Sequence, residues 1–351
     1  MTPPERPSDR AAPSVRPGAA SSPSERRRPL LQVERLSKVF PVRTSLMGAP
    51  RLVRAVDDVA FYVKHAESLG LVGESGCGKT TLGRTTLRLI EPTFGRIVFE
   101  GRDITLLSQR QLRPLRRHMQ LIFQDPFASL NPRMRVEDIV AEGLRVHGLT
   151  RSSRETRDEV VRTLESVGLS AGAMGRFPHE FSAGERQRIG IARAIAVRPS
   201  FVVCDEPVSA LDVSVRAQVM NLLVDLQREQ RLSYLFISHD LAVVRSLCHR
   251  VAVMYLGRIV EVGPTEQVFS QPRHPYTRAL LSAVPVADPD RRRLRIVLDG
   301  EPPSPLEPPE GCAFHPRCWK NDHAQCASRI PTLTETEPGS HHRAACWHPG
   351  D

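Results

Sequence analysis

Short apolar runs, each bounded by polar or turn-forming residues, recur along the chain from Leu30 to about residue 272. Runs of this length predict β-strands, and they lie at Leu31–Val33, Ala60–Val63, Ser68–Val72, Ile97–Phe99, Met119–Phe123, Phe201–Cys204 and Leu235–Ile237. The unbroken Phe201–Cys204 run is typical of a parallel strand covered on both faces. We also expect Met119–Phe123 to be a central strand of the sheet.

Between these runs, apolar residues recur at the spacing of one helix face. Three such faces are Val136, Ile139, Val140 and Leu144; Val160, Val161, Leu164 and Val167; and Val219, Leu222, Leu223 and Leu226. Gly168 follows the second face as a C-terminal stop. Thr81–Leu89 and Arg186–Val197 also have helical character. Alternating strands and helices predict an α/β fold with a mostly parallel sheet.

Composition divides the chain into three parts. Residues 1–29 are rich in Pro, Ser and Arg, and we expect a disordered tail because they cannot bury a core. Residues 30–275 form the expected main domain, with a helical subdomain at about 125–190 and a polar loop at Arg43–Arg54. Residues 276–351 form a separate appendage that is dense in proline and holds four of the seven cysteines.

Charge and hydropathy narrow the class of protein. The 351 residues carry a net charge of +10, which suggests anionic partners, although a basic surface and the arginine-rich tail explain most of it. Basic and aromatic residues are not interleaved as in single-strand binding proteins. No run of eighteen apolar residues and no secretory signal is present. We therefore expect a cytosolic protein with reduced cysteines.

The most informative segment matches the phosphate-binding loop G-x-x-x-x-G-K-[ST]. It consists of Gly73, Glu74, Ser75, Gly76, Cys77, Gly78, Lys79 and Thr80, with Thr81 opening the next helix. The glycines let backbone N–H groups surround the phosphates. Lys79 supplies a positive charge, and the Thr80 hydroxyl can bind Mg²⁺. A plain glycine turn is the alternative, but the strand before the loop and the helix after it favour a nucleotide site.

Three further strand ends carry polar side chains. Asp205 and Glu206 follow the buried Phe201–Cys204 run, where Asp205 can hold Mg²⁺ and Glu206 can deprotonate an attacking water. A helix N-cap is the alternative for this acidic pair. His239 follows Leu235–Ile237 and could reach a γ-phosphate. Gln124 follows Met119–Phe123 and is a candidate to contact Mg²⁺ or the water.

A second anion site is predicted at Phe181–Glu185, where Ser182, Ala183, Gly184 and Glu185 open a helix. An ordinary N-cap is the alternative. A chain with a single nucleotide-binding loop does not need a second phosphate-binding site (cradle) for its own nucleotide. The cradle makes sense if it serves a nucleotide that another subunit binds.

Together these segments resemble the ATPase subunit of an ABC transporter over roughly residues 31–275. Gly73–Thr80 resembles its Walker A loop, Phe201–Asp205 its Walker B strand, Glu206 its catalytic glutamate and Gln124 its Q-loop. Phe181–Glu185 resembles the signature motif, Ser209–Asp212 the D-loop and His239 the switch histidine. The resemblance implies a RecA-like core, an antiparallel β edge subdomain and a helical subdomain. It also implies that Asp212 lies close to nucleotide.

Further segments resemble the di- and oligopeptide importer subfamily of ABC transporters. They are Phe123–Pro132, Asp205–Ser214, His274–Leu281 and Gly311–Phe314. The resemblance to the second ATPase subunit of a dipeptide importer extends over nearly the whole chain beyond the N-terminal tail. The signature departs from the usual Leu-Ser-Gly-Gly-Gln. Ala183 adds a methyl group and Glu185 a negative charge, which mildly disfavours the ATP that this motif faces. Phe40 occupies a place where the family presents a ring to adenine, and a core phenylalanine is an equal alternative.

The cysteines divide into two groups. Cys77 lies at a helix N-terminus, a position that lowers the pKa of a thiol, so we expect sensitivity to oxidation. The second group lacks the paired cysteine spacing of structural zinc sites and consists of Cys312, Cys318, Cys326 and Cys346. Zinc remains an alternative because four histidines of the same segment can also bind it: His315, His323, His341 and His342. Members of the resembled subfamily hold an iron–sulfur cluster in this extension. The resemblance therefore implies a [4Fe–4S] cluster on the four cysteines, with zinc as the alternative.

The resulting hypothesis is an ATP- and Mg²⁺-dependent subunit that powers di- or oligopeptide import at the cytoplasmic face of the membrane. It implies a second ATPase subunit, two membrane permease subunits and an extracytoplasmic solute-binding protein. Another cargo, such as nickel or a sugar, is one alternative, because this subunit does not touch cargo. A nucleic-acid-linked ABC ATPase is another. Such proteins carry a long coiled coil between phosphate loop and signature, or two cassettes. Thr80 to Phe181 holds no heptads, and only one phosphate loop is present.

Overall fold

Two β-sheets form the framework of the protein. The computed structural model describes residues 28–42, 51–284, 295–322 and 324–350, so the expected tail at 1–29 lies almost wholly outside the described residues. The larger sheet has the strand order β11-β12-β10-β9-β3-β8-β7-β6. Its strands are β11 (Thr334–Glu335), β12 (Arg343–Ala344), β10 (Arg258–Pro264), β9 (Arg250–Tyr255), β3 (Ser68–Val72), β8 (Ser233–Ile237), β7 (Phe201–Asp205) and β6 (Met119–Ile122).

The five strands from β9 to β6 are parallel to their neighbours, and β10, β12 and β11 continue the sheet in antiparallel fashion. The expected mostly parallel core is therefore confirmed. The expectation that Met119–Phe123 is central was wrong, because β6 is the last strand of the sheet. Both faces of β6 are nonetheless covered, since Leu121 and Ile122 belong to cores on opposite sides. Burial of both faces gave this edge strand the apolar pattern of a central one.

The second sheet is antiparallel, in the order β2-β1-β4-β5. It contains β2 (Arg51–Val63), β1 (Leu31–Val42), β4 (Phe94–Phe99) and β5 (Arg102–Asp103). Residues 43–50 of the expected polar loop lie outside the described residues, while 51–54 belong to β2. This end of β2 is largely exposed, so it lacks the apolar alternation that reveals a strand in the sequence.

Two cores enclose the larger sheet. Val202 and Cys204 of β7 pack into one core, and Phe201 and Val203 pack into the other, so the strand is buried on both faces as predicted. The first core lies against the helices, and the second lies against the antiparallel sheet. This double cover fixes the sheet, and with it the carboxyl ends of the strands.

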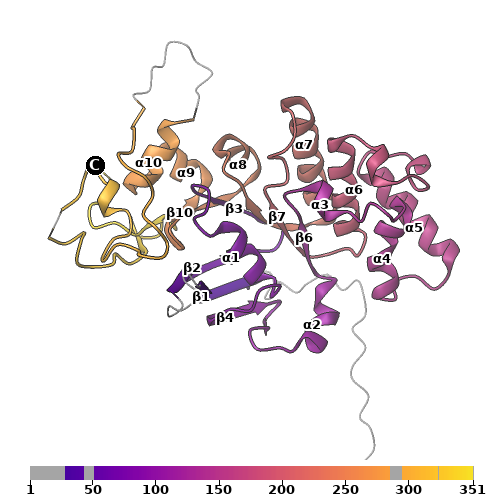
Figure 1. Ribbon diagram of the computed structural model, residues 1–351, viewed down its shortest axis with the longest axis horizontal. Coiled ribbons are helices and arrows are strands. Elements are labelled where there is room, and N and C mark those ends of the chain that lie inside the picture. Colours follow the sequence, from indigo (N-terminus) through magenta and orange to yellow (C-terminus); the bar gives the residue numbers. More distant parts are fainter. Residues whose placement is uncertain (1–27, 43–50, 285–294, 323, 351) are drawn as a thin grey trace, which may run out of the picture.

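The predicted helices are present as α1 (Lys79–Thr86), α4 (Val136–Val146), α5 (Ser153–Ser166), α6 (Ala183–Ile195) and α7 (Val213–Gln230). Gly168 follows α5 with φ 76°, as expected of a helix stop. The sequence pattern did not reveal α2 (Gln109–Arg116), α3 (Pro126–Ser129), α8 (Leu241–Leu247), α9 (Thr265–Ser270) or α10 (Pro275–Ser282). Helices α4, α5 and α6 gather at one end of the molecule (Figure 1).

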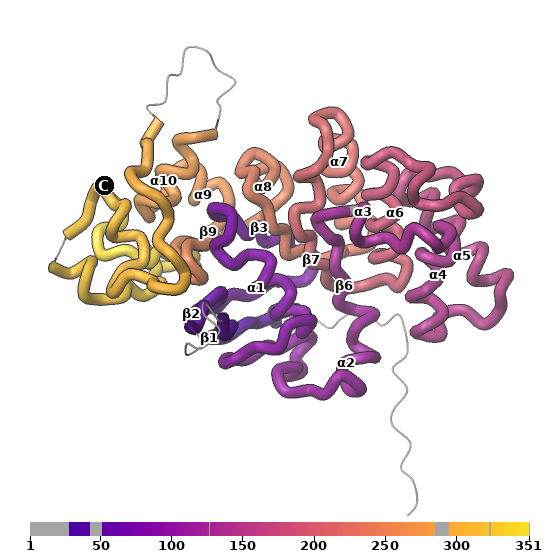
Figure 2. Tube along the Cα trace, viewed as in Figure 1, coloured from indigo at the N-terminus to yellow at the C-terminus, as the bar shows by residue number. Residues whose placement is uncertain are grey.

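The C-terminal extension lies at the opposite end of the molecule from α4 and α5 (Figure 2). Its strand β12 pairs with β10, so it continues the sheet of the main domain. Its buried ring Phe314 packs against Tyr255 and Tyr276, with ring centroids 5.3 Å and 5.4 Å apart. The extension is therefore packed onto the core. Its boundary near residue 275 stays a prediction.

Candidate active site

The phosphate loop connects the end of β3 to the start of α1, as predicted. Gly78 has φ 106°, and a Cβ there would lie 2.0 Å from the carbonyl oxygen of Ala55, so only glycine fits. The ammonium of Lys79 donates to the carbonyl oxygens of Gly73 at 2.8 Å and Glu74 at 2.9 Å. Within the described residues, no side chain caps the N-terminus of α1. Its N–H groups are therefore available to an anion.

Thr80 and Asp205 lie together beside this loop. The Thr80 hydroxyl donates to Oδ1 of Asp205 at 2.8 Å. The other oxygen, Oδ2, is buried without a hydrogen-bond partner among the described residues, and Nη2 of Arg84 is 3.7 Å from it. Burial raises the pKa of Asp205, while Thr80 and Arg84 oppose that shift. A buried carboxylate oxygen with a free lone pair beside a hydroxyl fits a hard divalent cation such as Mg²⁺.

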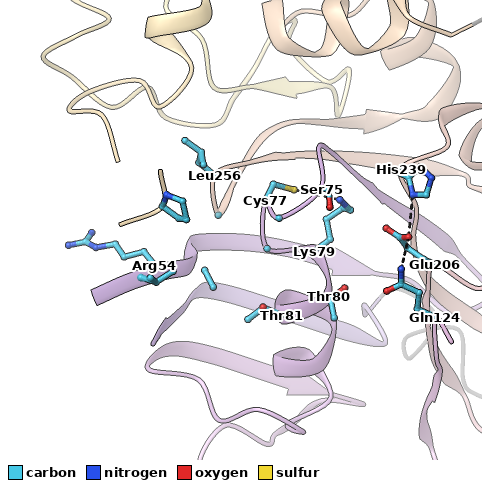
Figure 3. A pocket seen from close by; sticks show the side chains of 16 residues that line it. Arg54, Ser75, Cys77, Lys79, Thr80, Thr81, Gln124, Glu206, His239 and Leu256 are labelled. Atoms are coloured by element: carbon cyan, nitrogen blue, oxygen red, sulfur yellow. Dashed lines mark hydrogen bonds and ion pairs between the residues drawn. The ribbon is translucent and has the colours of Figure 1, made fainter. Parts of the chain in front are cut away.

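Glu206 is the centre of a three-residue cluster. Its Oε2 accepts a hydrogen bond from Nε2 of Gln124 at 3.1 Å and lies 3.2 Å from Nδ1 of His239 (Figure 3). These residues follow β6, β7 and β8, which are adjacent parallel strands, so their carboxyl ends meet at one edge. Glu206 has φ 47°, a left-handed conformation that is uncommon outside glycine. Such strain is concentrated at functional sites.

A cavity of about 470 Å³ joins the loop to this cluster. It is lined by Val53, Arg54, Ala55, Ser75, Gly76, Cys77, Gly78, Lys79, Thr80, Thr81, Gln124, Glu206, His239, Leu256, Gly257 and Pro305. The sequence reasoning missed the walls from β2, from the β9–β10 turn and from the C-terminal extension. Those residues carry no local motif, and only the tertiary fold brings them to the loop.

Phe40 is not among the described residues that line the cavity. Its ring is half-buried, with Nζ of Lys38 4.8 Å from the centroid. Its cross-strand partner Val53 lines the cavity instead. Contact between Phe40 and adenine therefore stays a prediction.

The signature segment forms the start of α6. Ser182 is the N-cap, and its hydroxyl donates to Oε2 of Glu185 at 2.8 Å. The same carboxylate oxygen accepts from the backbone N–H of Ser182 at 2.9 Å. These hydrogen bonds lower the pKa of Glu185. Neither Ala183 nor Gly184 is among the described residues that line the cavity. The expected service of this segment to a nucleotide of another subunit stays a prediction.

Asp212 is also outside the described lining of the cavity. Its carboxylate caps α7 by accepting from the backbone N–H of Val215 at 2.9 Å. Its predicted proximity to nucleotide stays a prediction.

The cysteines differ from the expectation in one respect. Burial raises the pKa of Cys77 although Lys79 opposes the shift, so the expected low pKa was wrong. Desolvation therefore exceeds the opposing effects of the Lys79 charge and hydrogen bonds. In the extension, burial raises the pKa of Cys312 to about 11, and Cys346, Cys326 and Cys318 add to that shift. Cys318 and Cys346 have raised pKa values for the same reasons.

All seven cysteines are free thiols. The four thiols of the extension lie within electrostatic reach of one another. Among the described residues, however, no three or more His, Cys, Asp or Glu side chains are grouped so as to hold a metal ion. His323 lies outside the described residues.

Known proteins match both parts of the chain. Residues 56–209 match the family described as ABC transporter, and residues 260–326 match the oligopeptide/dipeptide transporter C-terminal region. The dipeptide transport ATP-binding protein DppF of Haemophilus influenzae is 50% identical over 321 residues, covering 91% of this chain and 97% of that protein. The chain belongs to the ABC transporter family of ATP-binding proteins. This subunit is thus an ABC-type ATPase, and ATP is its nucleotide.

Two other similarities agree with this assignment. A Brucella ovis protein whose name describes peptide import and ATP binding is 52% identical over 318 residues, covering 91% of this chain and 97% of its own length. The Clostridium perfringens protein cbiO1, part of the ABC transporter complex cbiONQ, superposes with a TM-score of 0.59 at 26% identity, covering 69% of this chain and 91% of that one. The predicted ABC ATPase fold is confirmed.

ATPases of this family act as dimers in complexes with membrane permease subunits. Within the described residues of this chain, no helix has both the length and the apolar character needed to cross a membrane.

Proposed function

We propose that this ABC ATPase hydrolyses ATP to drive the import of di- or oligopeptides. The observation that carries the hydrolytic part is the convergence of Gln124, Glu206 and His239 on one wall of the cavity whose other wall is the phosphate loop. The peptide cargo is supported by the names of the relatives and by the match to the oligopeptide/dipeptide transporter C-terminal region.

The site residues divide the reaction between them. Lys79 and the N–H groups of α1 bind and orient the phosphates. Glu206 accepts a proton from the attacking water, while Gln124 and His239 orient the water and the γ-phosphate. When Mg²⁺ is bound, Thr80, Asp205 and Gln124 hold it, and it neutralises charge on the phosphates. The hydrogen bond from Gln124 already orients the Glu206 carboxylate.

Each site is proposed to need a second ATPase subunit. Ser182, Ala183, Gly184 and Glu185 are not among the described residues that line the cavity of their own chain, which supports a role opposite the phosphate loop of a partner, with Asp212 nearby. We propose that the partner is a different ATPase chain. We further propose that the pair docks on two permease subunits at the cytoplasmic face of the membrane, and that a solute-binding protein delivers cargo.

The decisive experiment compares Glu206→Gln with the wild-type chain in the assembled transporter. We expect Glu206→Gln to bind ATP but to lose turnover by a factor of about a hundred or more, because the amide cannot accept the proton. Glu229→Gln, on the same chain but at an exposed position of α7, is the matched control. Full hydrolysis by Glu206→Gln would remove Glu206 from the role of base.

Cargo is tested separately with reconstituted vesicles. Uptake of a labelled dipeptide that depends on ATP and is abolished by Glu206→Gln supports peptide import. ATP-dependent uptake of nickel or a sugar, without uptake of dipeptide, would replace the cargo and leave the ATPase assignment intact.

We also propose that Cys312, Cys318, Cys326 and Cys346 hold a [4Fe–4S] cluster, with zinc as the alternative. Their free thiols and mutual electrostatic influence support a shared ligand. The thiols are not grouped as ligands here, so the proposal requires them to draw closer in the loaded protein. Iron and sulfide analysis after anaerobic purification tests it, and a colourless protein that contains zinc would reject the cluster.

A further inference from the structure

The C-terminal extension reaches directly into the phosphate loop. Nη1 of Arg317 lies 2.9 Å and 3.2 Å from the two carboxylate oxygens of Glu74, the second residue of the loop. The two residues are 243 positions apart in the sequence. Arg317 is the last residue of a short helical turn, His315–Arg317. Neither the phosphate-loop motif that contains Glu74 nor the segment around Arg317 predicts this contact.

Every polar group of Glu74 is held by the protein. Its backbone N–H donates to the Tyr276 hydroxyl at 2.8 Å, and its carbonyl oxygen accepts from Lys79 at 2.9 Å. Its carboxylate is held by Arg317. Two of these three contacts come from residues at or beyond the end of the main domain. The conformation of Glu74, and hence of the loop, therefore depends on that C-terminal part of the chain.

Arg317 is itself fixed before it meets Glu74. Its side chain is 8% exposed and that of Glu74 is 26% exposed. The hydroxyl of Tyr255 also accepts a hydrogen bond from Nη1 of Arg317, at 3.4 Å. Three residues earlier, Phe314 is buried among Tyr255, Tyr276 and His274. This aromatic cluster anchors the turn, so little side-chain entropy is lost when the ion pair forms.

The charges explain why the pair matters. Glu74 is not among the described residues that line the cavity, but the next residue, Ser75, lines it. An uncompensated carboxylate on this loop would repel a bound polyphosphate, and the repulsion is stronger where water is partly excluded. Arg317 compensates that carboxylate. A second segment of the extension also reaches the site, because Pro305 lines the cavity and Glu307 lies 2.8 Å from Nη2 of Arg51.

We infer that Arg317 is a positioning residue of the ATP site, which acts through Glu74 and makes the C-terminal extension a determinant of ATP affinity. This inference rests on the proposed binding of ATP at the phosphate loop. It predicts a change in KM for ATP and in the dissociation constant, with kcat much less affected, because the Gln124–Glu206–His239 cluster makes no contact with Arg317 among the described interactions.

The test is a double-substitution cycle on the full-length chain, read by titration with a fluorescent ATP analogue and by steady-state hydrolysis. Arg317→Gln leaves Glu74 partly buried and uncompensated, and we expect ATP to bind about tenfold more weakly. In a Glu74→Gln background the same substitution should weaken binding by less than about threefold, because no carboxylate is left to repel phosphate. Arg317→Lys should recover part of the lost affinity.

Arg343→Gln is the matched control. It removes an arginine of the same extension, and Nη2 of this arginine lies 3.5 Å from Oε1 of Glu335. Glu335 is far from the phosphate loop in the sequence. Equal ATP affinity in wild type and Arg317→Gln would overturn the inference. So would an equal loss in the Glu74→Gln background, since that result indicates a general loss of structure. Failure of the wild-type chain itself to bind ATP would instead reject the proposed function.

Discussion

The N-termini of α1 and α6 are both expected to meet the phosphates of ATP, yet they differ in what occupies them. At α1 no described side chain caps the helix, and Lys79 turns back onto the loop's own carbonyl oxygens. At α6 the Ser182 hydroxyl accepts from the backbone N–H of Glu185 and the Glu185 carboxylate accepts from the backbone N–H of Ser182, which forms a capping box. The Ser182 hydroxyl also donates to that carboxylate. The first end is an open anion site, whereas the second already holds an internal anion in place of a phosphate.

The difference indicates a division of labour. The open end of α1 can bind nucleotide without any change in the chain. The end of α6 must release the Ser182 hydroxyl from Glu185 before it can donate to a phosphate. A third helix, α10, is capped by a ring: Nδ1 of His274 accepts from the backbone N–H of Tyr276 at 3.1 Å. This cap requires a neutral imidazole and supports the tyrosine that holds Glu74.

The largest effect is expected at the open end. Lys79→Ala removes a buried positive charge, and we expect ATP affinity to fall about a hundredfold with loss of turnover, because charge-assisted hydrogen bonds to phosphate are lost. Equilibrium nucleotide titration measures it, with Lys64→Ala at an exposed position as control. A change below about threefold would mean that the uncapped N–H groups alone hold the phosphates.

The second effect concerns the histidine cap. Burial lowers the pKa of His274 to about 4, below its usual 6.5, although Glu261 opposes the shift. Between pH 6.5 and pH 4 His274 is protonated in the unfolded chain but neutral in the folded chain. Its contribution to the free energy of unfolding is therefore full above pH 6.5 and is lost as the pH falls towards 4. The loss amounts to up to about 3 kcal/mol.

Urea unfolding at a series of pH values measures this loss. His274→Asn keeps a capping acceptor but does not titrate, so the dependence between about pH 6.5 and pH 4 should flatten even if the variant is less stable overall. His65→Asn, at an exposed position, is the control. An unchanged slope in His274→Asn would assign the acid sensitivity to other groups.

A third effect separates capping from phosphate binding at α6. Ser182→Ala should lower the free energy of unfolding by about 1 kcal/mol through loss of the cap. It should also slow ATP turnover of the two-subunit assembly at least about tenfold, since the phosphate loses a donor. Ser152→Ala removes the equivalent N-cap of α5, which accepts from Glu155 at 3.1 Å. If both variants lose stability and keep turnover, Ser182 is only a cap.

The smallest effect is expected from Glu185→Gln, which restores the usual signature residue. Removing the carboxylate takes a negative charge away from the partner's nucleotide and weakens its hold on the Ser182 hydroxyl. We expect KM for ATP of the assembly to fall about twofold, the size typical of one exposed charge. Glu155→Gln, at the same capping position of α5, is the control. A rise in KM would show that the capping box assists ATP binding.

Motifs at strand ends were predictable because their geometry follows from the sheet. The phosphate loop, His239, Glu206 and Gln124 follow β3, β8, β7 and β6, and these strands are neighbours in that order. A run of buried strands with polar residues at their carboxyl ends therefore fixes a site before the fold is known.

The rest of the site depends on contacts that carry no local signal. Arg317 and Pro305 lie in a proline-rich segment without periodicity, more than 200 residues after the loop that they approach. The order of strands was equally hidden, because burial on both faces makes the edge strand β6 resemble a central one. The pKa of the Cys77 thiol is raised by burial, whereas its place before a helix predicted a lowered pKa. Burial depends on the packing of the whole molecule and has no local signal in the sequence.

The strand β12 also bears on the solubility of this protein. It covers the outer edge of β10, which would otherwise offer unpaired backbone groups beside the buried residues Ile259, Val260 and Val262. Such an apolar edge is a template for pairing with another chain. A chain shortened before Arg343 would thus be prone to self-association, even though every residue of the phosphate loop would remain.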